Sequence, residues 1–181
     1  MRTVTYGAAC SLDGFIAGPD GSVDWLHFSQ DVQEVMGRYW STIDTLIMGR
    51  KTWEFAAANA PAEEGDIPMS GIRTYVFSRT LKELSRPGVE LIASDPGAFV
   101  RDLKAKPGKG ICVMGGGALA RSLFDAGVID EVGVNVHPVL LGSGIRMFVD
   151  GGTRTTLTLA RSRQIDGGCM LLDYEVSRPG A

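Results

Sequence analysis

The stretch Thr45-Leu46-Ile47-Met48-Gly49-Arg50-Lys51-Thr52-Trp53 decides the fold expected for this chain. Its apolar run, 45–48, has the composition of a buried strand, and it stops at a glycine followed by two cations and a hydroxyl. A strand that turns at glycine into a helix presents unpaired backbone N–H groups, which attract anions. The stretch is therefore interpreted as an anion-binding turn between a strand and a helix.

A second stretch has the same layout. The apolar residues 110–114 precede Gly115-Gly116-Gly117, and a helical pattern follows over 118–126. Two such joints favour a ligand with more than one phosphate group. The G-x-G-x-x-G dinucleotide fingerprint and the P-loop pattern are both absent from the sequence. The predicted site is therefore divided among several strand ends.

Composition and charge exclude several function classes. A length of 181 residues predicts one domain, 1–181. The net charge of −3 and the pI near 5.4 argue against nucleic acid or an anionic membrane as a partner. No apolar run approaches the ~20 residues that span a bilayer. Cys10, Cys112 and Cys169 are odd in number and widely spaced; Cys10 and Cys112 lie in apolar, strand-like surroundings and are expected to be buried thiols, which favours a reducing, cytoplasmic compartment. No Cys/His cluster has the spacing of metal ligands.

Strand and helix patterns alternate along most of the chain, and only strands follow near its end. This order predicts an α/β domain with a mainly parallel central sheet and an antiparallel closing pair. The glycine-rich segment 11–21 is expected to be a loop, either a ligand lid or a surface excursion, and 56–71 a surface connection. The expected strands are 4–10, 45–48, 73–77, 89–92, 111–114, 131–136, 155–162 and 168–176, and the expected helices are 30–42, 52–58, 96–106 and 118–126.

Polar groups follow three of these strands: 49–52, Ser78-Arg79 and 115–117. Ligands of open α/β sheets bind at the carboxyl ends of strands, where these groups are expected to meet. Taken singly, a glycine run often serves only close packing, and an Arg-Lys pair is often a solvated turn. A purely structural interpretation therefore remains open, although the three groups together favour a phosphorylated cofactor.

Several motifs, in their order, resemble the dihydrofolate reductase superfamily, and within it the C-terminal reductase branch of riboflavin biosynthesis. They span roughly residues 4–150. The resemblance implies a dihydrofolate reductase-like three-layer fold with flanking helices, NADPH as hydride donor, and a stand-alone bacterial reductase that forms a homodimer. The motifs are AACSLDGFIAG (8–18), Asp24-Trp25, LIMGRKTWE (46–54), YVFSRT (75–80), VMGGGALARSLFDAGVIDEV (113–132) and HPVLLGSGIRMF (137–148).

The resemblance also implies roles for individual cofactor-binding residues. Arg50 is expected to pair with the adenosine 2′-phosphate, and a planar guanidinium suits a phosphate. Ala118 stands where the family has an arginine, which leaves more of this task to Arg50 and Arg79. The implied contacts are Ala9 and Ile16 at the nicotinamide; Arg50, Ser78 and Arg79 at the 2′-phosphate; Lys51 and Thr52 at the pyrophosphate; and Gly115, Gly116 and Gly117 at the nicotinamide ribose and pyrophosphate. The remaining expected cofactor-binding residues are Gly49, Ala118 and Leu119.

The substrate side rests on two candidate catalytic residues. Asp31 lies nearest to the acid that folate reductases carry on their first helix, and Asn135 stands where the family often has a threonine partner. Asp31, or water held by Asp31 and Asn135, would polarise or protonate the acceptor. The plainer interpretation of Asp31 is a carboxylate favoured at a helix start.

The function expected from these residues is NADPH-dependent hydride transfer to a small planar heterocycle that resembles a pterin, a folate or a riboflavin precursor. The alternative is an NADP(H)-binding protein without turnover that acts as a sensor or an interaction module.

Overall fold

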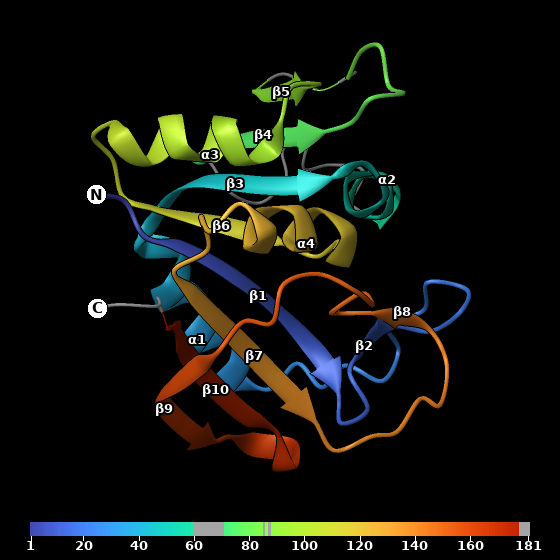
Figure 1. The fold of residues 1–181 in the computed structure, drawn as a ribbon. Coiled ribbons are helices and arrows are strands. Elements are labelled where there is room, and N and C mark those ends of the chain that lie inside the picture. Colours follow the sequence, from blue (N-terminus) through green and yellow to red (C-terminus); the bar gives the residue numbers. More distant parts are fainter. Residues whose placement is uncertain (60–70, 85, 87, 178–181) are drawn as a thin grey trace.

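The computed structural model describes residues 1–59, 71–84, 86 and 88–177. Its centre is an eight-stranded sheet in the order β5-β4-β3-β6-β1-β7-β10-β9 (Figure 1). In this spatial order, the six strands β5, β4, β3, β6, β1 and β7 are parallel to one another, and β10 pairs antiparallel with both β7 and β9. The predicted mainly parallel sheet with an antiparallel C-terminal pair is confirmed.

The bounds of the elements follow the predicted pattern closely. The helices are α1 (Gln30–Ser41), α2 (Arg50–Asn59), α3 (Pro96–Ala105) and α4 (Gly117–Asp125), with a short 3-10 turn at Asp166–Gly168. The strands are β1 (Val4–Ser11), β2 (Phe15–Ala17), β3 (Ile43–Gly49), β4 (Arg73–Phe77), β5 (Val89–Ile92), β6 (Gly110–Met114), β7 (Glu131–His137), β8 (Ile145–Arg146), β9 (Leu157–Gln164) and β10 (Met170–Val176).

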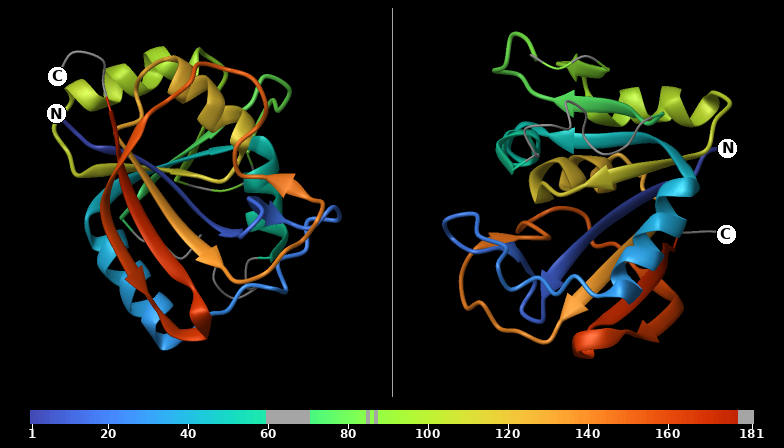
Figure 2. Two further views of the ribbon diagram at one scale, coloured as in Figure 1. Left: turned by 60° about the horizontal axis from the view of Figure 1, so that its bottom comes forward. Right: turned by 180° about the vertical axis from the view of Figure 1, so that it is seen from behind.

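Two apolar layers hold the helices against opposite faces of the sheet (Figures 1 and 2). On one face, Val100 of α3 and Leu123 of α4 are fully buried against strand residues such as Tyr6. On the other face, Trp53 of α2 and the half-buried Tyr39 of α1 pack against the central strands. Because successive strand side chains point to opposite faces, the nearly continuous apolar runs of β3 and β6 supply both layers. The predicted three-layer arrangement is confirmed.

Local signals in the sequence explain where the helices begin and end. The Ser29 hydroxyl accepts the N–H of Val32 at 3.3 Å, which caps α1. The Asp95 carboxylate caps α3 in the same way, accepting the N–H of Ala98 at 2.8 Å. Gly127, at φ 65°, ends α4 in the left-handed conformation that favours glycine. All three terminal positions carry a residue type that favours a helix end.

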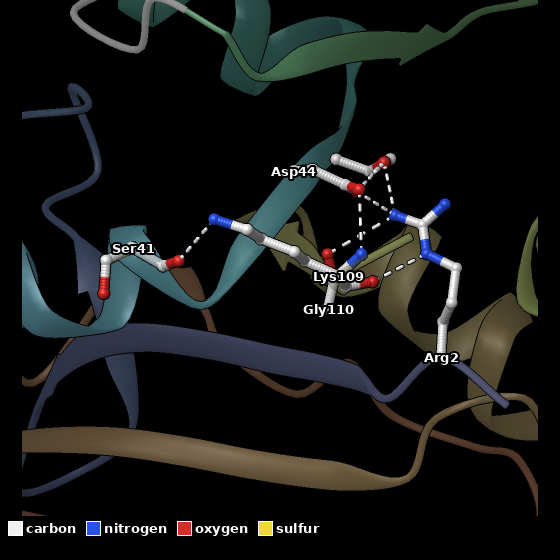
Figure 3. Close-up of polar contacts among 6 residues, drawn as sticks. Arg2, Ser41, Asp44, Lys109 and Gly110 are labelled. Atoms are coloured by element: carbon white, nitrogen blue, oxygen red, sulfur yellow. Dashed lines mark hydrogen bonds and ion pairs between the residues drawn. The ribbon is translucent and has the colours of Figure 1, made fainter. Parts of the chain in front are cut away.

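A polar network ties the amino ends of three strands together, away from the loops at their carboxyl ends (Figure 3). The Arg2 guanidinium is largely buried; it pairs with Asp44 and donates to the Thr45 hydroxyl at 2.6 Å. Its Nε also donates to the carbonyl of Lys109 at 2.6 Å, and the N–H of Lys109 donates to Asp44 at 2.8 Å. This network fastens the starts of β1, β3 and β6 to one another.

Two sequence expectations differ from the structure. The segment 11–21 is not a free loop, because β2 within it pairs antiparallel with β8 in a separate two-stranded sheet. This sheet is too short, at three and two residues, to give a periodic sequence signal. Helix α2 begins at Arg50 rather than at Thr52, so both cations lie in its first turn. Most of the expected connection 56–71 lies outside the described residues.

The described residues agree with the expected cysteine chemistry. Cys10, Cys112 and Cys169 are all buried free thiols. Within the described ranges there is no cluster of three or more His, Cys, Asp or Glu side chains that fits a metal ion. No helix in the same ranges is both long enough and apolar enough to cross a bilayer.

Candidate functional site

The three predicted anion-binding groups lie at the ends of neighbouring strands. Strand β3 sits between β4 and β6, with Gly49 opposite Phe77 on one side and Met48 opposite Met114 on the other. All three strands are parallel, so their carboxyl ends meet at one edge of the sheet. The groups 49–52, 78–79 and 115–117 therefore lie side by side at that edge.

The glycine turn after β6 lies directly against the start of α2. A Cβ atom on Gly115 would stand 2.8 Å from the Thr52 hydroxyl oxygen, and Gly115 has a φ of 59°. Gly116, at φ 63°, is the N-cap of α4 and has no side chain to bond the first N–H groups of that helix. Two helix starts with bare backbone are thus brought together, an arrangement that fits a dinucleotide with two bridging phosphates.

The cations at this edge differ in their surroundings. Arg50 donates from one nitrogen, Nη1, to both carboxylate oxygens of Glu54 at 2.9 and 3.1 Å. Lys51 and Arg79 are exposed, so both are accessible to a ligand. The Ser78 hydroxyl accepts the N–H of Leu81 at 3.0 Å and so also shapes the turn after β4. Arg50, with its side chain 40% exposed, is also in contact with solvent.

Two residues of the predicted set have clear positions at the start of α4. Ala118 is exposed on the first turn. Leu119 is buried in the core, and its N–H donates to the carbonyl of Gly116 at 2.9 Å. Leu119 therefore packs in the core, and the backbone available to a ligand at the start of α4 is that of the preceding Gly115 and Gly116.

Of the two predicted nicotinamide contacts, Ala9 lies near the carboxyl end of β1 in the central sheet, and Ile16 lies in β2 of the separate two-stranded sheet. Ala9 of β1 pairs in register with Asn135 of β7, and β1 is the neighbour of β6. Ile16 is the middle residue of β2, whose other residues, Phe15 and Ala17, pair with β8. The loop that carries Ile16 is therefore held in place by its own small sheet.

The two candidate catalytic residues, Asp31 and Asn135, do not contact each other in the described part of the chain. Asp31 faces the β9–β10 turn, where one carboxylate oxygen accepts the N–H of Asp166 at 3.3 Å and the other lies 3.7 Å from the Arg163 guanidinium. It also lines an open depression with Gln30, Glu34 and Asp166. These contacts agree with the plainer interpretation of Asp31 as a helix-start charge, and its catalytic role stays a prediction.

Asn135 has the more suggestive environment. Its Oδ1 atom is buried and has no hydrogen-bond partner among the described residues. Buried amide oxygens in native proteins are nearly always paired, so this atom is a candidate for a ligand contact. The indole N–H of Trp25 is also buried and has no hydrogen-bond partner among the described residues. Trp25 packs edge-on against His137, two residues beyond Asn135, with ring centroids 5.3 Å apart.

His137 has a perturbed environment at the same strand end. Its ring is 98 % buried and its Nδ1 accepts the backbone N–H of His27 at 3.4 Å, so the neutral ring carries its proton on Nε2. Cys169 lies 3.4 Å from the same nitrogen. Burial, assisted by the nearby His27 ring, lowers the pKa of His137 below its usual value. The lowered pKa favours the neutral imidazole, which packs edge-on against Trp25.

Sequence reasoning missed three residues of this region. Asp13, in the predicted loop, accepts N–H groups from the segment after β7. Glu54 holds Arg50, and the i,i+4 spacing of an acid and an arginine on a predicted helix was a usable signal. His137 appears in the sequence analysis only as part of a motif. Its contact with Trp25 joins segments about 110 positions apart, and no local sequence pattern predicts such a contact.

A family model for the RibD C-terminal domain matches residues 2–171. The chain belongs to this family. The RibD C-terminal family is a reductase family related to riboflavin biosynthesis, so the resemblance inferred from the motifs is confirmed.

Two of the relatives match this RibD-type chain over nearly their whole length, and a third, bifunctional protein matches it over part of its length. It is 31% identical over 181 residues to the uncharacterized protein YyaP of Bacillus subtilis, covering 96% of this chain and 95% of YyaP. Among solved structures, a protein from Shewanella sp. PV-4 whose name ties it provisionally to riboflavin biosynthesis is 26% identical, with a TM-score of 0.85 and coverage of 98% and 100%. The bifunctional deaminase and 5-amino-6-(5-phosphoribosylamino)uracil reductase of Thermotoga maritima is 17% identical, with a TM-score of 0.71, and shares the fold over 97% of this chain and 57% of its own.

Proposed function

We propose that this chain is an NADPH-dependent reductase that passes a hydride to a small planar heterocycle resembling a pterin, a folate or a riboflavin precursor. The observation that carries the proposal is the adjacency of three phosphate-compatible groups at the carboxyl ends of β4, β3 and β6. Membership in a reductase family supports the same conclusion.

The residues at this edge divide the binding of the dinucleotide among them. In the proposal, Arg50, Ser78 and Arg79 hold the 2′-phosphate, and two arginines there favour NADPH over NADH. Gly49, Lys51 and Thr52 hold the pyrophosphate together with the backbone of Gly115–Gly117. When bound, the dinucleotide supplies the hydride, and the protein supplies position and a proton source.

The substrate is proposed to lie over β1 and β7. Ala9 and Ile16 keep the nicotinamide side apolar, which excludes water from the place of hydride transfer. Asn135 offers a buried acceptor and Trp25 a buried donor to the polar edge of a heterocycle. Asp31, or water between it and Asn135, remains the proposed source of the proton.

A second candidate function is an NADP(H)-binding protein without turnover, and a specific observation favours it. The Asp31 carboxylate contacts Asp166 in the β9–β10 turn and Arg163 of β9. Among the described residues, no contact therefore identifies the group that would donate the proton. A sensor or interaction module needs the dinucleotide site alone.

A titration followed by a turnover assay separates these functions. NADPH is expected to quench the fluorescence of Trp53, which lies beside Thr52 on α2, and to bind with a Kd in the micromolar range of about 1–100 μM. Steady NADPH oxidation with pterin, flavin-precursor or quinone-like acceptors supports the reductase. Binding without oxidation supports the sensor, and the absence of binding would overturn both.

The proposed partners are the small-molecule substrate and a second copy of the chain. On the α3–α4 side of the sheet, no helix among the described residues covers β10 and β9 (Figure 1). Leu159 is 52% exposed there and pairs with the half-buried Tyr174. The opposite face of the same strands is charged, with Arg161 paired to Asp173. An apolar face of this kind suits a homodimer, and free buried thiols suit a reducing compartment such as the cytoplasm.

A further inference from the structure

The pairing of Arg50 with Glu54 gives the proposed adenosine end of the site both signs of charge. One nitrogen of Arg50 donates to both oxygens of Glu54, at 2.9 and 3.1 Å. Within the described part of the chain, the other two guanidinium nitrogens of Arg50 have no hydrogen-bond partner. An incoming phosphate can therefore reach Arg50 without displacing Glu54.

The position of Glu54 makes its charge relevant to a ligand. The side chains of Arg50 and Glu54 are 40% and 47% exposed, so both face solvent at the same edge. Glu54 is the single acid of α2, whose first turn contains none. A ligand held by Arg50 is therefore within reach of one carboxylate, and that carboxylate is fixed in place by the arginine.

The two groups favour different sugars. An arginine accommodates the 2′-phosphate of NADPH, whereas an acid accepts hydrogen bonds from the free 2′-hydroxyl of NADH. A carboxylate next to a 2′-phosphate repels it, because both are negative. A site with Arg50 alone would discriminate strongly for NADPH, and a site with Glu54 alone would favour NADH.

We propose that Glu54 is a specificity-determining residue that enables this site to bind NADH as well as NADPH. The inference rests on the proposed function, since it assumes that Arg50 meets the adenosine ribose. Glu54 weakens binding of the 2′-phosphate by its charge and strengthens binding of the 2′-hydroxyl as an acceptor. The ratio of the two affinities is thus set by the pair and not by Arg50 alone.

Equilibrium binding of both nucleotides to four proteins tests the proposal. Kd is measured by calorimetry for NADPH and NADH with the natural protein, Glu54→Gln, Arg50→Ala and the control Asp102→Asn. Asp102 is an exposed acid on α3, which packs against the opposite face of the sheet from α2. Thermal unfolding of each variant without nucleotide verifies that it is folded.

The expected pattern is reciprocal. Glu54→Gln should tighten NADPH about threefold and weaken NADH about tenfold, because it removes the charge and leaves a poorer acceptor. Arg50→Ala should weaken NADPH about 10- to 100-fold and change NADH far less. Asp102→Asn should change neither Kd.

The outcomes distinguish this inference from the proposed function. If the natural protein binds NADPH and NADH but Glu54→Gln leaves the ratio of their Kd values within about twofold, the role of Glu54 is wrong and the dinucleotide site stands. If the natural protein binds NADPH but shows no measurable NADH binding, the role of Glu54 is likewise wrong. If neither nucleotide binds, the inference falls together with the proposed function.

Discussion

The carboxylate of Asp13 accepts the backbone N–H of Gly142 at 2.8 Å and so joins two loops that lie 129 positions apart in the sequence. The same carboxylate accepts the N–H of Leu141 at 3.2 Å and the hydroxyl of Ser11 at 2.6 Å. Ser11 in turn accepts the N–H of Phe15 at 2.9 Å. The segment that carries Ile16 is therefore fixed to the segment after β7 by one carboxylate and by the β2–β8 pairing.

Replacing this carboxylate should loosen the loop that carries Ile16. Asp13→Asn keeps the shape of the side chain but loses the charge that strengthens each hydrogen bond. We expect faster amide hydrogen exchange at Phe15 and Gly142, and a fall in kcat for NADPH oxidation of about tenfold, because the loop positions the reacting groups. Asp20→Asn is the matched control, since within the described ranges the Asp20 carboxylate bonds to its near neighbour, the N–H of Ser22, at 2.9 Å. Equal effects of the two substitutions would contradict the linking role of Asp13.

The same contacts predict an acid-dependent opening of the two loops. The Ser11 hydroxyl, ahead of the N–H groups of Gly142 and Leu141, holds the pKa of Asp13 below its ordinary value of 3.8. A carboxyl whose pKa is lowered by folding stabilises the folded state above its unfolded pKa and loses that contribution as the pH falls through the lower, folded value. The protection of the Gly142 amide, measured as its exchange rate relative to an unstructured amide at the same pH, should therefore stay high at neutral pH and fall below about pH 4.

Much of this architecture was predictable because its signals are local. The glycine turns, the caps at Ser29 and Asp95 and the apolar strands all depend on neighbouring residue types, and the order of strands and helices was sufficient to predict the mainly parallel sheet with its antiparallel closing pair. The three-layer arrangement was implied by the family resemblance. The β2–β8 sheet, the Asp13 contacts and the position of His137 against Trp25 join residues more than 100 positions apart. Such contacts leave no periodic trace in one sequence. Asp31 had a helix-start signal, which the structure agrees with, whereas its proposed chemical role depends on a ligand geometry that no local pattern reports.

Gly115 and Gly127 form a matched pair for testing the close approach of the glycine turn to α2. Both have positive φ, 59° and 65°, so alanine is strained at either position by about 1–2 kcal/mol. A Cβ on Gly115 would also stand 2.8 Å from the Thr52 oxygen, whereas a Cβ on Gly127 has nothing within 4 Å. Gly115→Ala should weaken NADPH binding at least about tenfold, and Gly127→Ala should lower only stability. Calorimetric titration of both variants decides the point, and equal NADPH affinities would remove the turn from the proposed site.

The network around Arg2 should matter for stability and not for nucleotide binding, because it lies at the opposite ends of the strands (Figure 3). Arg2→Ala leaves Asp44 without its buried partner and should cost about 2–3 kcal/mol. This is less than for a fully buried pair, because the Asp44 side chain is 34% exposed. In a protein of this size the Tm should fall by about 5–10 °C. Arg161→Ala, which breaks the exposed pair with Asp173, should cost less than about 1 kcal/mol. A change in NADPH affinity for Arg2→Ala would contradict the separation of the two ends.

The apolar face of β9 and β10 gives a direct test of the proposed homodimer. Leu159 is half exposed on β9, the edge strand of this face, so Leu159→Asp puts a charge into the interface of a dimer but into solvent in a monomer. If two copies pair through this face, light scattering should change from the mass of a dimer to that of the 19.3 kDa chain, while the Tm of the isolated domain changes little. Arg161→Asp is the control on the charged face of the same strand and should leave the mass unchanged. Leu159 pairs with Tyr174 and Arg161 with Asp173, and the β-bulge between these two pairs turns Arg161 to the face opposite Leu159. A natural protein that is already monomeric at micromolar concentration, or a Leu159→Asp variant that remains dimeric, would rule out this interface.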